Sequence, residues 1–211
     1  MREVARFNCL WAVYNKAAEK AGSAKVEPAR RAILTEEALP VRAEMAAVLK
    51  RIFDALLRTV GNTGELGTIA NWEQHLLPGA WERPEAELAK MLGSDLPPDV
   101  LLSRAYSGPL RVFVPAVRTS LEVGEALTIR AVVRGKGKPE TAALRWREMG
   151  RGEFRSVPLE HKARGVYAAT IPPFAGAIEY YVEVKAGGEA AFFPSTAPAA
   201  SQTVIVLPVV K

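Results

Sequence analysis

Apolar residues recur with the 3.6-residue period of an amphipathic helix through much of the first half of the chain. The clearest case is the segment 41–60, where they fall at i, i+3, i+4 and i+7 over about five turns. Pro40 stands at its expected first helical position, and Gly61 follows its end. The same period is found in segments 2–21, 27–38 and 84–93. Short connections between these segments predict a helical bundle.

The segment 62–81 interrupts this helical period, because it contains three glycines and, near its end, a proline. It holds two of the four tryptophans, Trp72 and Trp81, and one of the two histidines, His75. We therefore expect an irregular segment within the bundle, and we expect functional residues to concentrate there.

The second half changes to short runs of β-branched and aromatic residues separated by glycine, proline and charged residues. In the run 177–187, every second residue from Ile178 to Val184 is predicted to face a core, and Tyr181 to face solvent. A slip of one residue would reverse every side chain, so the register is strongly specified. Seven or eight such runs predict an antiparallel, immunoglobulin-like β-sandwich. The runs are 111–116, 126–134, 142–149, 154–162, 166–173, 177–187, 191–194 and 201–208.

Charge changes at the same place as the pattern. Residues 1–108 hold 14 Lys or Arg and 14 Asp or Glu, whereas residues 109–211 hold 14 and 9, so the whole net charge of +5 lies in the second half. Prolines and glycines before residue 110 mark a connection. We therefore predict a multi-domain α and β protein, with a helical bundle over 1–108 and a sandwich over 109–211.

Composition excludes several classes of protein. The 211 residues contain no apolar run of the ~20 residues that a membrane span needs, and the first twenty residues do not resemble a signal peptide. Cys9, expected to be buried on its helix, has no second cysteine to pair with, and two histidines cannot complete a zinc site with it. The positive charge is interleaved with glutamates and forms no basic stripe for nucleic acid. We expect no metal, no cofactor, no nucleic-acid partner and no membrane span.

Trp146 in a predicted central strand, the turn IPPFAG at 171–176 and the run IEYYVEV at 178–184 resemble an immunoglobulin-like or fibronectin type III-like module. The ending FFPSTAPAASQTVIVLP at 192–208 is similar to the last hairpin of such modules in large bacterial secreted proteins. The resemblance covers about half the chain. It implies a sandwich fold and leaves the function open, because sandwiches serve many roles.

In the first half, the run GELGTIANWEQH at 64–75 resembles segments on the C-terminal side of bacterial glycoside-hydrolase-type multidomain proteins. This resemblance implies a non-catalytic accessory region, which contacts polysaccharide or supports a catalytic domain. It also implies that the chain is one piece of a longer protein, extracellular or periplasmic if that protein is secreted. No catalytic motif matches residue by residue, so the resemblance assigns no catalytic residue.

Glu65 and Glu73 support an alternative function, that of a small glycan-acting hydrolase. Glycoside hydrolysis needs two carboxylates about 5–10 Å apart beside a sugar site, and Trp72 lies between these two glutamates in sequence. The competing interpretation is structural: Glu65 caps a helix, Trp72 fills the bundle, and Glu73 and His75 lie on the surface.

Four aromatic residues are candidates for ligand binding, because flat aromatic faces stack on sugar rings. Phe192 and Phe193 are consecutive, so one of them must point away from the core. The alternative is that these aromatics cover the junction between the two halves. The candidates are Trp72, Trp81, Tyr181 and Phe193.

Charged residues on predicted outward faces are expected to form cross-strand ladders if their strands pair. A third functional hypothesis is a protein–protein interaction module that uses an exposed sandwich edge. The charged residues concerned are Arg130, Arg145, Arg147, Glu179, Glu183 and Lys185.

Overall fold

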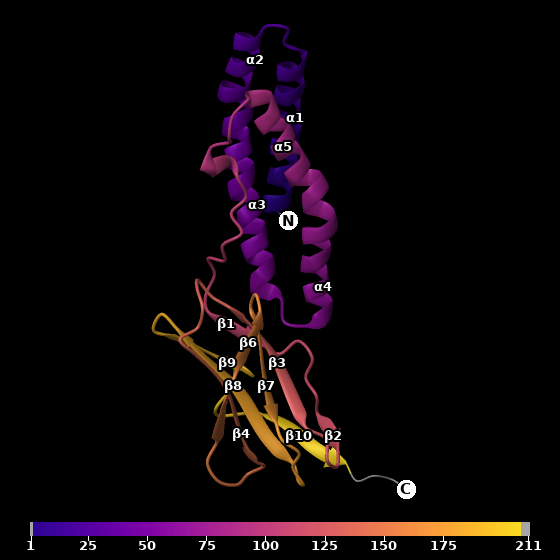
Figure 1. The fold of residues 1–211 in the computed structure, drawn as a ribbon, viewed down its shortest axis with the longest axis vertical. Coiled ribbons are helices and arrows are strands. Elements are labelled where there is room, and N and C mark those ends of the chain that lie inside the picture. The colour runs from indigo at the N-terminus through magenta and orange to yellow at the C-terminus, as the bar shows by residue number, and fades with distance from the viewer. Residues whose placement is uncertain (1, 208–211) are drawn as a thin grey trace. The chain divides into compact units, whose positions relative to one another are not determined.

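A computed structural model describes residues 2–207 (Figure 1). The chain divides into two compact units, one of Met1–Val60 with Leu66–Ala105 and one of Gly61–Glu65 with Tyr106–Lys211. Helices fill the N-terminal part and strands the C-terminal part, which confirms the predicted fold class of a helical bundle followed by a β-sandwich. The exact domain boundary stays a prediction.

The helical unit contains long helical runs around one apolar core, to which α1, α3 and α5 contribute Tyr14, Leu49 and Leu88. Among the described residues, no helix is both long and apolar enough to cross a membrane. The elements η1 to η3 are π-helical turns, and η4 is a 3₁₀ turn. The bounds are α1 Arg2–Ser23, α2 Glu27–Ile33, η1 Leu34–Ala38, α3 Leu39–Thr59, α4 Thr63–Asn71, η2 Trp72–Leu76, η3 Pro78–Glu82, α5 Arg83–Leu92 and η4 Pro98–Val100.

The segment 62–81 is helical from Thr63 onward, so the prediction of an irregular segment is wrong. The physical reason is the widened π-helical turn. A proline inside an α-helix clashes with the carbonyl four residues earlier, and a π-helical turn relaxes that spacing. Pro78 lies two residues after the end of η2, so the carbonyl four residues before it belongs to Gln74 inside η2. Pro40 likewise lies two residues after the end of η1, and the helical run that contains it starts at Glu27 rather than at Pro40.

Cys9 is exposed on α1, contrary to the expectation of a buried thiol. It lies two residues after Phe7, which packs against the core. Two residues turn an α-helix by about 200°, so Cys9 projects from the opposite side.

The sandwich has two sheets, one in the order β1-β3-β7-β6 and the other in the order β2-β10-β8-β4-β5, with β9 also paired to β8. Strand pairs are antiparallel apart from β2 with β10, which are parallel. The bounds are β1 Arg111–Phe113, β2 Ser120–Glu122, β3 Leu127–Arg134, β4 Thr141–Glu148, β5 Arg155–Pro158, β6 Glu160–Ala163, β7 Val166–Ile171, β8 Ile178–Ala186, β9 Glu189–Phe193 and β10 Gln202–Leu207.

The predicted alternation is confirmed, because one buried cluster joins the inward residues of both sheets, from Leu127 and Ile129 to Tyr180 and Val182. The predicted run 154–162 differs, since it is split into β5 and β6 in different sheets. β5 ends at Pro158, where the chain leaves this sheet for β6 in the other sheet. The sequence also missed the short strand β2, and residue 208 of the last predicted run lies outside the described residues.

Tyr180 lies in the middle of this core with 0% exposure. Its hydroxyl oxygen has no hydrogen-bond partner within residues 2–207. Burial raises the pKa of Tyr180 to about 12. A buried hydroxyl without a partner costs about 1–3 kcal/mol, so Tyr180 contributes to stability through its ring and not through its oxygen.

We predict that Tyr180→Phe is at least as stable as the wild type at neutral pH and gains up to about 1 kcal/mol. The pKa in the folded state lies above the unfolded value of about 10, so the folded chain holds a proton that the unfolded chain loses. The contribution of this held proton to the free energy of unfolding is complete below pH about 10 and is lost as the pH rises through about 12. Guanidinium unfolding of the intact chain at pH 7 to 12 should therefore show a steeper alkaline loss in the wild type. Equal slopes, or a strongly destabilised variant at pH 7, would contradict this.

Candidate functional site

The outer face of β4 and β8 carries the predicted ladder of charged pairs. Arg145 Nη2 lies 3.0 Å from Glu183 Oε2, and Arg147 Nε donates to Glu179 Oε1 at 2.8 Å. Lys185 Nζ lies 3.0 Å from the other oxygen of Glu183. The expectation for these residues is confirmed, whereas Arg130 lies on β3 in the other sheet and takes no part.

Both glutamates of this ladder are held in the ionised form. A hydrogen bond from the Gly150 backbone N–H and a second from Arg147 lower the pKa of Glu179. Burial acts to raise the pKa of Glu183, but hydrogen bonds from Lys185 and Arg145 outweigh it and the pKa is lowered. This face therefore offers paired charges and hydrogen-bonding groups, with neither ladder carboxyl group poised to donate a proton at neutral pH.

Three aromatic rings lie on the same face beside the ladder. Tyr181 on β8 contacts Phe154, just before β5, with ring centroids 4.9 Å apart, and Phe192 on β9 at 6.4 Å. The Arg147 guanidinium stacks on the Phe154 ring, 4.2 Å from its centroid. The three rings are half-buried and remain outside the sandwich core cluster. We call them the aromatic row.

The register between β8 and β9 decides which of two consecutive phenylalanines joins this row. Phe192 pairs with Glu183 and shares its outward face, whereas Phe193 pairs with the buried Val182. Phe193 accordingly packs against the sandwich core. Its predicted ligand-binding role is untested, and the outward position belongs to Phe192.

A hollow of ≈ 550 Å³ lies beside the row. It is lined by outward residues of β4, β5 and β8 and reaches the core residues Leu159 and Tyr167, while none of the three rings lines it. Its walls include polar side chains from three strands, and Arg145 stands directly opposite Tyr181 in the β4–β8 register. Aromatic surface and hydrogen-bonding groups thus adjoin a concave surface. The polar lining residues are Glu140, Thr141, Arg145, Ser156, Tyr167, Glu183 and Lys185.

Trp72 and Trp81 belong to a different site, within the helical unit. Both line a pocket of ≈ 420 Å³ between α1, α3, η2 and η3, together with Phe7 and Trp11. Trp72 and Trp81 are nine residues apart in the sequence. In a regular α-helix nine residues make two and a half turns, so the two indoles would lie on opposite sides. Because η2 and η3 are π-helical, with roughly 4.4 residues per turn, the same nine residues make about two turns and both indoles face one pocket.

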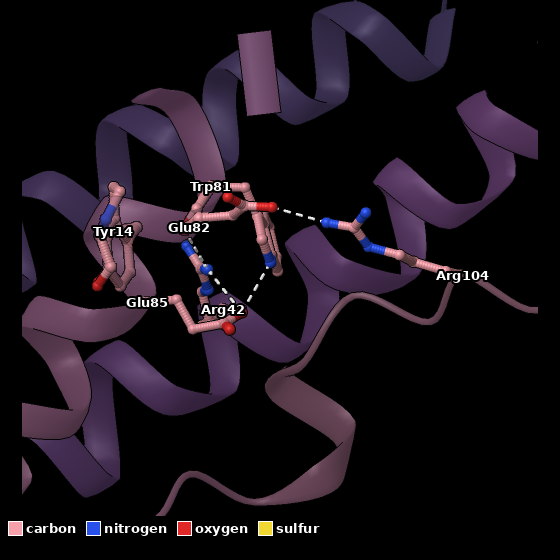
Figure 2. A network of polar contacts seen from close by, with 7 residues as sticks. Tyr14, Arg42, Trp81, Glu82, Glu85 and Arg104 are labelled. Carbon is pink, nitrogen blue, oxygen red and sulfur yellow. Dashed lines mark hydrogen bonds and ion pairs between the residues drawn. The ribbon is translucent and has the colours of Figure 1, made fainter. Parts of the chain in front are cut away.

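Trp81 is fixed in place by a buried arginine (Figure 2). Arg42 on α3 is fully buried, and its guanidinium carbon lies 3.4 Å from the centroid of a Trp81 ring. Its Nη2 donates to the Trp81 carbonyl at 3.0 Å. Figure 2 shows the Glu85 carboxylate reached both by Arg42 and by the Trp81 indole N–H, the latter at 2.8 Å. Burial lowers the pKa of Arg42, an effect that nearby Tyr14 and Glu85 oppose.

Glu65 takes the capping role that the sequence allowed as an alternative. Its carboxylate accepts hydrogen bonds from the backbone N–H groups of Gly61 at 2.6 Å and Asn62 at 3.2 Å. Asn62 Oδ1 in turn accepts from the Glu65 N–H at 3.0 Å, which completes a reciprocal cap at the start of α4. The carboxylate thus points back to the residues before α4, whereas Glu73 lies eight residues later, about 12 Å along a helix.

Several residues of these sites were missed by sequence reasoning. Phe154, Trp11 and Arg42 are not among the candidate residues that the sequence pattern indicated. One signal in the sequence could have located the site in the helical unit. Arg42 places a charge on the apolar stripe of its helix, beside Val41 and Met45. Within residues 2–207, no group of three or more His, Cys, Asp or Glu side chains could hold a metal ion.

No protein-family model matches the sequence, and a search of curated proteins returns no match. Among solved structures, the chain is similar at 12% identity to the endo-β-1,4-mannanase of Thermotoga petrophila, with a TM-score of 0.34 over 58% of this chain and 24% of that one. The swine CD8αα homodimer gives 12% identity and a TM-score of 0.33 over 47% of this chain and 98% of that one. A conjugative transposon lipoprotein of Bacteroides eggerthii gives 15% identity and a TM-score of 0.29 over 46% of this chain and 98% of that one.

Proposed function

We propose that the chain is a non-catalytic, carbohydrate-binding accessory region that holds a neutral polysaccharide on the outer face of β4, β8 and β9. The observation that supports this most is the aromatic row of Phe154, Tyr181 and Phe192 beside a polar hollow. Apolar ring faces cover the C–H faces of sugar rings, and the charged side chains in the hollow bond the hydroxyls.

The pairing of charges favours a neutral polysaccharide over an acidic one. Arg145 and Arg147 are each matched by a glutamate, and Lys185 shares Glu183 with Arg145. An acidic sugar would have to displace one of these carboxylates from its cation. A sugar hydroxyl can donate to a glutamate and accept from an arginine without breaking the pair.

The same pairing favours binding over hydrolysis. A glycosidase needs one protonated carboxylic acid, whose pKa its surroundings raise, to protonate the leaving group. On this face the pKa values of Glu179 and Glu183 are both lowered. These carboxylates can accept hydrogen bonds from a glycan but do not supply the acid.

Tyr181→Ala should weaken polysaccharide binding about tenfold, or about 1.4 kcal/mol, because it removes the middle ring of the aromatic row. Affinity electrophoresis of the intact chain in gels with β-glucan, mannan or xylan measures the retardation, with polygalacturonate as the acidic comparison. Met149→Ala is the matched control, since Met149 is an apolar residue just after β4, is 54% exposed and is not part of the row. Wild-type retardation that Tyr181→Ala leaves unchanged, or retardation by polygalacturonate alone, would overturn the proposal.

Glu65→Ala should lower the free energy of unfolding by about 1 kcal/mol, because α4 loses its reciprocal cap. Polysaccharide retardation should be unchanged. Unfolding by guanidinium, followed by circular dichroism at the helical band, measures the loss.

A reducing-sugar assay on the intact chain tests the alternative function. If the wild type released sugar and Glu65→Gln or Glu73→Gln abolished the release, the hydrolase would be the correct function instead.

A further inference from the structure

We propose that the helical unit has a second binding site, for an uncharged and largely apolar small molecule with a planar ring. The site is the pocket of ≈ 420 Å³ between α1, α3, η2 and η3. This volume lies within the range of about 300–1,000 Å³ typical of small-molecule pockets. The inference goes beyond the glycan-binding proposal and uses none of the residues that carry it.

The walls of the pocket are rich in aromatic rings. Trp11, Trp72 and Trp81 are three of the four tryptophans of the chain, and Phe7 adds a fourth ring. Phe7 and Trp11 are stacked with centroids 6.1 Å apart, and Trp72 packs edge-on against Phe53 at 5.4 Å. Indole and phenyl faces in a concave site match a flat apolar ligand.

The lining residues also define the charge of the ligand. Among the described residues that line the pocket, none is ionisable, and Asn8 is the only one with a polar side chain other than the indoles. A charged group in the pocket would be removed from water without a partner, which is strongly unfavourable. Asn8 is exposed at the rim and can bond one polar group of the ligand. The ligand is therefore uncharged, with few polar atoms.

The deep wall of the pocket is preorganised. Trp81 is 2% exposed, its indole N–H is bonded to Glu85, and Arg42 both stacks on it and binds its carbonyl. A ring that is already fixed loses little further freedom when a ligand packs against it. The π-helical turns that bring Trp72 and Trp81 to one side are an independent indication, because such turns occur frequently at functional sites.

A small molecule suits this site better than a protein partner. Specific protein interfaces bury about 1,200–2,000 Å² with a broad apolar centre. Here the apolar lining residues that stand exposed are Val4 and Leu76, at 45% and 46%, whereas Leu77 and Trp81 lie below the surface. The apolar surface is thus mostly inside the pocket and not spread around it.

N-phenyl-1-naphthylamine, an uncharged aromatic dye, is the probe. Titrated into the intact chain and excited through tryptophan, it should bind saturably at one site by energy transfer from the pocket indoles. Ala80→Phe, which places a ring in the pocket from η3, should weaken binding at least tenfold. Ala47→Phe, on an exposed position of α3 that does not line the pocket, is the matched control and should bind as the wild type does.

The anionic dye 1-anilinonaphthalene-8-sulfonate has nearly the same rings and should bind at least tenfold more weakly than the neutral dye. Absence of saturable binding, equal binding by Ala80→Phe, or equal affinity for the two dyes would each overturn the proposal. Sedimentation that shows a wild-type dimer and an Ala80→Phe monomer would overturn it in favour of a second copy of the chain.

Leu76→Arg is a second variant in case Ala80→Phe fails to fold. Leu76 is exposed at the rim, so the bundle should tolerate the change, while a charge at the entrance should weaken binding of the neutral dye severalfold. Wild-type affinity in Leu76→Arg would count against the site. Tyr181→Ala should leave dye binding unchanged, so failure of this proposal and failure of the glycan-binding proposal can be told apart.

Discussion

The pairing of β8 with β4 is the constraint on which the sandwich depends. The register that sets Leu144 opposite Val182 in the core also sets Arg145 opposite Tyr181 on the outer face. A slip by one residue would turn Glu179 and Glu183 into the core, where an unpaired carboxylate is strongly unfavourable. The core therefore fixes the outer face of β4 and β8, and with it the charged ladder and Tyr181. Phe192 depends in addition on the pairing of β9 with β8, and Phe154 on the segment before β5.

This constraint explains how much of the sandwich the sequence could predict. Alternation with a period of two residues is visible along β4 and β8, so the outward Tyr181 and the charged ladder follow from counting along each strand. The choice between Phe192 and Phe193 does not follow in this way. Their register depends on the turn at Gly187 and Gly188, both with positive φ, and turn geometry sets the pairing of a hairpin. Sequence reasoning could only say that one of the two faces outward.

In the helical unit, by contrast, the sequence period misled the prediction for part of the chain. Its long amphipathic helices were visible as a period of 3.6 residues, but that period assumes an α-helix throughout. In η2 and η3 the turn is wider, and residues that the α-helical period assigns to opposite faces come to share one. Glycines and Pro78 then indicated a loop where the chain continues as a helix. The pocket also needs α1 and α3 from distant parts of the sequence, and no local pattern reports that packing.

Arg42 is better explained by the position of Trp81 than by the stability of the bundle. An ion pair in a protein interior gains little over well-packed apolar side chains of the same volume, because both charges lose their water. Arg42 retains two nitrogens without a hydrogen-bond partner among the described residues, and its ion pair with Glu85 is long at 3.4 Å. What an apolar side chain could not do is bond the Trp81 carbonyl and stack on its ring at the same time. The apolar contacts of α1, α3 and α5 therefore hold the bundle together, and the buried guanidinium determines where the indole stands in the pocket.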